Sequence, residues 1–124
     1  MEPKVLVVDD DPAVLYTVEV VLDEAEVPVS TVPSGPDCLD RLEKGFRGLI
    51  LLDIMMPGMD GCQTVREMAE RGWIDGNLVC MLTAVTDPAG ALDPVKDVVV
   101  EYVQKPFQPD ELVRTVREYL AYLA

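Results

Sequence analysis

Aspartates that directly follow two apolar runs are the side chains of this sequence most able to do chemistry. Asp9, Asp10 and Asp11 come after the run VLVV, and Asp53 comes after LILL. Carboxylates brought together by such strands repel one another unless a positive charge lies among their oxygens. A set of oxygen ligands suits a hard divalent cation such as Mg²⁺. Asp9, Asp10 and Asp53 are therefore the candidate ligands of a metal site.

The elements that must position these residues are predicted by apolar periodicity. Helical spacing of apolar residues alternates with short β-branched runs, which is typical of a parallel sheet with helices on both faces. The predicted strands are Lys4–Val8, Val27–Val32, Leu49–Leu52, Leu78–Leu82 and Glu101–Gln104. The predicted helices begin at Pro12 and near Ser34, span about Cys62–Arg71, and begin again at Pro109. The expected fold is α/β, a doubly wound, flavodoxin-like sheet of five parallel strands.

Two helices have a clear apolar side that should face the sheet. In the helix after Asp60 this side is formed by Val65, Met68 and Ala69. In the last helix it is formed by Leu112, Val116, Tyr119, Leu120 and Leu123. These residues are the expected helical contribution to the core.

The carboxyl ends of the predicted strands gather the polar residues at one edge of the sheet. Asp9 and Asp10 follow the first strand, Asp53 the third, Thr83 the fourth and Lys105 the fifth. Ligands of open α/β sheets bind at this edge, near the point where the strand order reverses. A nucleophilic carboxylate, a metal, a hydroxyl and an ammonium group together would suit phosphoryl transfer.

Four sequence motifs resemble the receiver domain of two-component response regulators, and the resemblance covers essentially all 124 residues. The motifs are VVDDDP at 7–12, LDIMMPGMDG at 52–61, LTA at 82–84 and YVQKPF at 102–107. Each is weak alone, but their order and spacing are highly specific. The resemblance implies a phosphorylation-controlled switch rather than a metabolic enzyme.

The resemblance also implies a role for each residue near the acceptor. Asp53 would accept a phosphoryl group from a sensor histidine kinase or a phosphotransfer protein. Asp9, Asp10 and Asp53 would bind Mg²⁺ with help from the backbone carbonyl of Met55.

Further roles are implied beside the phosphoryl group itself. Thr83 and Lys105 would contact that group, and Thr83 with Tyr102, the family's switch aromatic, would transmit the change. A cis peptide between Lys105 and Pro106 is also implied.

Each assignment has a structural alternative. Asp11 is equally well explained as the N-cap of the helix at Pro12, and Asp60 as a turn residue. Thr83 alone is an ordinary strand residue, Lys105 a solvated charge, and Tyr102 a half-buried aromatic that packs well without moving.

Two other functions are compatible with this architecture. A Mg²⁺-dependent phosphatase of the haloacid-dehalogenase type also uses an aspartate nucleophile at a strand end, but it needs a second Asp two residues later. Here that position is Met55. A flavodoxin-like cofactor binder would need a loop rich in Ser, Thr and Gly after the first strand, where Asp10 and Asp11 would repel phosphate.

Length and composition set the remaining expectations. The 124 residues predict one receiver domain over 1–124, with no output domain, either stand-alone or cut from a longer protein. With a net charge of −13, direct contact with nucleic acid or membrane is not expected. The apolar runs are too short to cross a membrane, there is no secretion signal, and a cytoplasmic location is expected. The three cysteines are expected to be small buried apolar residues rather than disulfide or zinc ligands.

The stretch between Thr83 and Lys105 departs from the resembling family. Pro88, Gly90 and Pro94 interrupt the helical pattern. A fourth helix over Asp87–Asp97 is therefore expected to be short or irregular.

Overall fold

A computed structural model describes residues 4–84 and 98–123 of the chain. The described residues form one sheet of five parallel strands in the order β2-β1-β3-β4-β5. The strands are β1 (Lys4–Val8), β2 (Val29–Val32), β3 (Gly48–Asp53), β4 (Leu78–Thr83) and β5 (Val99–Gln104). The helices are α1 (Pro12–Glu24), α2 (Gly35–Glu43), α3 (Gly61–Glu70) and α5 (Pro109–Leu123). The doubly wound α/β prediction is confirmed.

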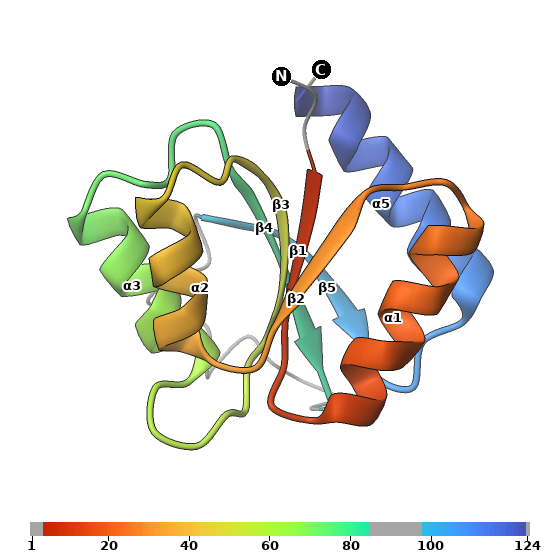
Figure 1. Ribbon diagram of the computed structural model, residues 1–124, viewed down its shortest axis with the longest axis horizontal. Helices are drawn as coiled ribbons and strands as arrows, with labels where there is room; N and C mark the ends of the chain where they lie inside the picture. The colour runs from red at the N-terminus through yellow and green to blue at the C-terminus, as the bar shows by residue number, and fades with distance from the viewer. Residues whose placement is uncertain (1–3, 85–97, 124) are drawn as a thin grey trace.

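Helices cover both faces of the sheet (Figure 1). α2 and α3 pack on one face, where Leu6, Val8, Ile50 and Leu52 point toward them. α1 and α5 pack on the other face, against the alternate residues of the same strands. Because β1 and β3 are buried on both sides, they read as continuous apolar runs rather than as alternating patterns.

Polar side chains begin three of the helices. Asp11 caps α1 by accepting a hydrogen bond from the Ala13 N–H at 2.9 Å, and Ser34 caps α2. Asp60 caps α3 in a capping box with Gln63. The N-cap interpretation of Asp11 is confirmed, whereas Asp60, predicted as a turn residue, is the N-cap of α3.

Several predicted boundaries and faces were wrong. β2 begins at Val29 rather than Val27, since Val27 lies in the turn after α1, with its N–H bonded to the Leu22 carbonyl. β5 begins at Val99 rather than Glu101 and carries a register irregularity against β4. α3 begins and ends one residue earlier than predicted, and Ala69 is exposed rather than buried.

The last helix also packs less deeply than predicted, because only two of its five predicted core positions are fully buried. Leu112 and Val116 are buried, whereas Tyr119, Leu120 and Leu123 are partly buried against the same cluster. The predicted irregular helix over 87–97 lies outside the described residues.

The composition-based expectations can be compared directly with the structure. All three cysteines are buried thiols outside any disulfide, as predicted. Among the described residues, no helix is both long and apolar enough to cross a membrane.

The strand order reverses between β1 and β3. From β1 the chain moves to β2 on one side of the sheet and then to β3 on the other. Such a switch point leaves a crevice beyond the carboxyl ends of the two strands. Asp9 and Asp53 occupy those ends.

Candidate functional site

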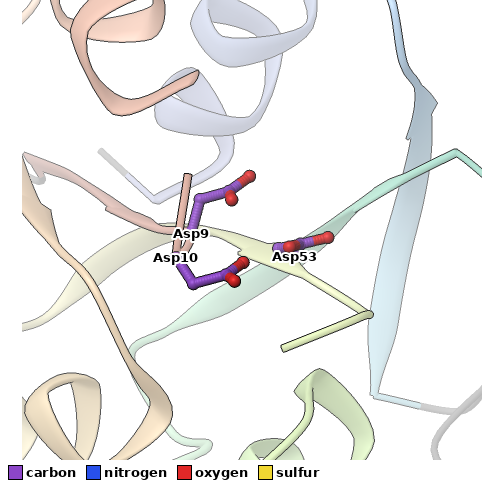
Figure 2. Close-up of side chains that lie close together, drawn as sticks. All are labelled: Asp9, Asp10 and Asp53. Carbon is purple, nitrogen blue, oxygen red and sulfur yellow. The ribbon is translucent and has the colours of Figure 1, made fainter. Parts of the chain in front are cut away.

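Three aspartates from two adjacent strand ends form an acidic cluster. Carboxylate oxygens of Asp9, Asp10 and Asp53 all lie within 4.8 Å of one another. Figure 2 shows the three side chains together beyond the ends of β1 and β3. The register explains their proximity, because Val8 pairs with Leu52 one residue before Asp9 and Asp53. The grouping predicted for these three residues is confirmed as geometry.

The three aspartates differ in their environment. Asp9 is fully buried and Asp53 is 5% exposed, whereas Asp10 is exposed. Asp9 Oδ1 accepts a hydrogen bond from the Asp11 N–H at 2.9 Å, and Asp53 Oδ1 accepts one from the Met55 N–H at 3.3 Å. Two buried carboxylates are thus fixed in place, with a third at the solvent side.

Lys105 brings the positive charge that the cluster needs. Its Nζ lies 2.6 Å from Asp9 Oδ2 and 3.4 Å from Asp53 Oδ1. Its backbone N–H donates to the carbonyl of Thr83 at 2.7 Å, which ties the end of β5 to the end of β4. In this structure the ammonium group therefore bridges two carboxylates rather than being a solvated charge.

One cation does not balance the cluster. Burial, and next the charge of Asp9, raise the pKa of Asp53 from 3.8 to about 6, although Lys105 and the Met55 N–H act in the opposite direction. Burial lowers the pKa of Lys105, but its bond to Asp9 and the two negative charges outweigh that effect and leave the pKa raised. The site keeps an excess of negative charge that a bound cation would relieve.

The other predicted site residues lie at the end of β4, in β5 and in the loop after β3. Thr83 is 1% exposed and ends β4, beside the Asp53–Leu82 pair of the ladder. Tyr102 is partly buried, pairs with Met81 and packs on the face covered by α2 and α3. The Met55 side chain is 68% exposed in the loop after β3. The implied cis peptide between Lys105 and Pro106 is present.

The direct contact between Lys105 and Asp9 was missed from the sequence. The two residues are 96 positions apart, and only the assembled sheet places them together. The sequence indicated only that both residues follow predicted strands. It therefore predicted that Lys105 and Asp9 lie at the same edge of the sheet, but not that they form an ion pair.

The fold and the acidic site are those of a signalling receiver. The family model for the response regulator receiver domain matches residues 5–117 of the chain. This chain belongs to the response regulator receiver domain family. That membership argues against the phosphatase and flavodoxin-like alternatives.

Individual relatives are similar over most of this chain. The DNA-binding response regulator MtrA of Mycolicibacterium smegmatis is 33% identical over 120 residues, which are 97% of this chain and 51% of that protein. The chain thus spans about half the length of this curated relative. A CheY-like response regulator receiver domain protein from Methanospirillum hungatei superposes with a TM-score of 0.91 at 36% identity, covering 99% of this chain and 98% of that one.

A third relative was solved with a ligand. TrrA of Thermotoga maritima, a response regulator in complex with Mg²⁺-BeF, has a TM-score of 0.81 and 29% identity. The match covers 94% of this chain and 98% of that one.

Proposed function

We propose that Asp53 is the phosphoacceptor of this receiver domain, and that a sensor histidine kinase or a phosphotransfer protein is the donor. The observation that carries the proposal is the placement of a buried carboxylate beside two others and one ammonium group. Asp53 is the member of the trio that ends β3 at the switch point, and burial together with the charge of Asp9 raises its pKa. Such perturbation is typical of groups that do chemistry.

The proposed transfer is a single displacement at phosphorus. A carboxylate oxygen of Asp53 forms a bond to phosphorus while the bond from phosphorus to the imidazole nitrogen of the donor breaks. The electron pair of that bond stays on the imidazole, and the product is an acyl phosphate. Lys105 Nζ, 3.4 Å from Asp53 Oδ1, would offset negative charge on the phosphoryl oxygens. The hydroxyl of Thr83 would donate to one of them.

The acidic cluster fits Mg²⁺ by the chemistry of its donors. Asp9, Asp10 and Asp53 offer carboxylate oxygens, and the backbone carbonyl of Met55 would add a fourth oxygen ligand. When bound, Mg²⁺ would supply the charge neutralisation that lets an anionic carboxylate approach an anionic phosphate. TrrA, the Thermotoga maritima relative solved with Mg²⁺-BeF, supports this assignment.

The consequence of phosphorylation would be a change of partner binding. Thr83 is the last residue of β4, and Tyr102 lies within β5. A phosphoryl group that contacts Thr83 would shift the position of Tyr102. The downstream partner is a protein, because a chain with net charge −13 repels nucleic acid and anionic lipid. We expect the domain to act in the cytoplasm and to catalyse only its own phosphorylation and dephosphorylation.

The proposal is tested with acetyl phosphate, which donates its phosphoryl group and leaves as acetate. Incubation with Mg²⁺ should add one phosphate to the protein by intact mass, and chelation of Mg²⁺ should prevent it. Asp53→Asn should abolish the adduct. Asp75→Asn is the matched control, because Asp75 is exposed and lies outside the cluster.

Two results would contradict the proposal. Equal labelling of Asp53→Asn and the parent protein would exclude Asp53 as the acceptor. Release of free phosphate at many turnovers, with no adduct trapped at short times, would instead indicate a phosphatase.

A further inference from the structure

The first turn of α3 is packed directly on the backbone of the acceptor. Gly61, the first residue of α3, is buried, and its N–H donates to the carbonyl of Ile54 at 2.9 Å. The Ile54 N–H in turn donates to the Leu82 carbonyl at 3.2 Å. These bonds join the end of β3 to β4 on one side and to α3 on the other.

There is no room for a side chain at Gly61. A Cβ atom built there would lie 2.5 Å from the carbonyl oxygen of Asp53 and 2.9 Å from Cα of Ile54. Both are backbone atoms, so no side-chain rotation can relieve the overlap. The φ of Gly61 is not in the left-handed region, unlike that of Gly58, Gly72 and two other glycines. Space, and not backbone freedom, is therefore what position 61 requires.

We infer that Gly61 is a positioning residue for the phosphoacceptor: its missing side chain lets α3 seat against the Asp53–Ile54 backbone and so fixes Asp53 and Met55. The inference rests on the proposed function of Asp53. A methyl group at position 61 would push the strand end and the helix apart by roughly 1 Å, since nonbonded carbon atoms settle at about 3.5 Å or more. The Met55 N–H and carbonyl lie within the displaced segment.

A second contact keeps the same turn in place. The hydroxyl of Thr64, a fully buried residue of α3, donates to the Asp60 carbonyl at 2.8 Å. The backbone N–H of Thr64 donates to the same carbonyl at 3.0 Å, so two bonds from Thr64 close the turn that presents Gly61 to Asp53.

The test compares Gly61→Ala with Gly72→Ala, which is the same substitution beyond the opposite end of α3. Gly72 has φ +74 with nothing within 4 Å of a built Cβ, so its replacement strains the helix end without touching Asp53. Two readouts are taken on each variant well below its melting temperature. They are the Mg²⁺ dissociation constant from calorimetry and the rate of labelling by acetyl phosphate.

Gly61→Ala should weaken Mg²⁺ binding and slow labelling by about tenfold or more, because small displacements of reacting groups are costly. Gly72→Ala should lower the melting temperature yet leave both values within about twofold of the parent. If Gly61→Ala matches Gly72→Ala in both readouts, the inference is wrong. If Gly61→Ala does not fold in buffer, both readouts are repeated on it and on the parent in an osmolyte that restores folding: a roughly tenfold loss in the variant supports the inference, and parental values overturn it.

The two proposals fail in different ways. An unlabelled parent protein would refute the acceptor role of Asp53, while Mg²⁺ affinity would still test the positioning role of Gly61. A labelled parent with an equally labelled, equally Mg²⁺-binding Gly61→Ala would refute the positioning role alone.

Discussion

Strand β3 has a buried polar side chain beside each of its ends, and the two are accommodated differently. At the amino end, the amide of Asn77 accepts from the Gly48 N–H at 2.9 Å and donates to the Trp73 carbonyl at 2.7 Å. At the carboxyl end, the carboxylate of Asp53 faces two other carboxylates and shares Lys105 with Asp9. The Asn77 amide is neutral and bonded on both sides, whereas the negative charge of Asp53 is disfavoured, first by burial and next by the charge of Asp9.

This difference separates a polar group that stabilises the structure from one to which we assign chemistry by proposal. Buried polar groups stabilise a fold only when their hydrogen bonds are made. Asn77 meets that condition and joins the β3 start to the loop before β4. The burial of the Asp53 charge and its repulsion by Asp9 are a cost to folding. Under the proposed function, the same property would prepare the site for a cation and a phosphoryl group.

The largest effect is expected at the structural end. Asn77→Ala should lower the free energy of unfolding by about 3 kcal/mol, because it leaves the buried Gly48 N–H without a partner and opens a small cavity. Urea denaturation measures this loss. The nearby exposed Asp75→Ala should change it by less than about 0.5 kcal/mol. A loss below about 1 kcal/mol for Asn77→Ala would show that water replaces the amide.

The carboxyl end should respond in the opposite direction. In metal-free buffer at pH 8, Asp53→Asn should raise the free energy of unfolding by about 2 kcal/mol. At this pH the Asp53 carboxylate is ionised, and its negative charge destabilises the folded protein. The pKa of Asp53 is raised from 3.8 to about 6, so the folded state binds the proton more tightly than the unfolded state. The cost of Asp53 is therefore complete above pH 6 and disappears as the pH falls toward 4.

Urea denaturation of both proteins at several pH values checks this prediction, and the difference between them isolates Asp53 from the other carboxylates. The gain from Asp53→Asn should shrink steadily between pH 6 and pH 4. A gain that is constant across that range would mean that charge is not its cause.

Mg²⁺ should relieve the same repulsion in the parent protein. At a concentration ten times its dissociation constant, a ligand that binds only the folded state adds about 1.4 kcal/mol. The melting temperature should rise accordingly, and Asp10→Asn should reduce the rise, while Asp75→Asn should not. An equal rise in all three proteins would point to a nonspecific effect of the salt on a chain of net charge −13.

From the sequence, the edge of the sheet that holds the site could be predicted better than the contacts between the site residues. Residues at the ends of buried strands can be recognised from the apolar run that precedes them. For this reason Asp9, Asp53 and Thr83 could be assigned to one edge of the sheet. The Asp11 cap was likewise a local signal. Contacts that depend on the assembled sheet had no such signal: Lys105 reaches Asp9 across 96 positions, and Gly61 meets Asp53 through backbone atoms alone.

The predicted boundaries of the strands and helices were wrong for a related reason. Val27 and Ala69 have the right apolar character for a strand and for a buried helix face. Tertiary packing instead places Val27 in a turn and leaves Ala69 exposed. Propensity and periodicity narrow the choice of element, and the packing of neighbours decides where each one begins.

The smallest effect is expected at a strained residue far from the site. Glu26 has φ 61, a left-handed conformation that costs a non-glycine residue about 1 kcal/mol. It lies between α1 and β2, at the amino end of the strands and so opposite the acidic cluster. Backbone strain near Asp53 could contribute to the proposed reaction, but strain at Glu26 lies too far from the acidic cluster to do so.

Glu26→Gly should therefore raise the free energy of unfolding by up to about 1 kcal/mol in urea denaturation, offset in part by the greater freedom of glycine in the unfolded chain. Labelling by acetyl phosphate should stay at the parental rate. A slower rate in this variant would connect the α1–β2 turn to the acceptor and would break the separation between the two ends of the sheet.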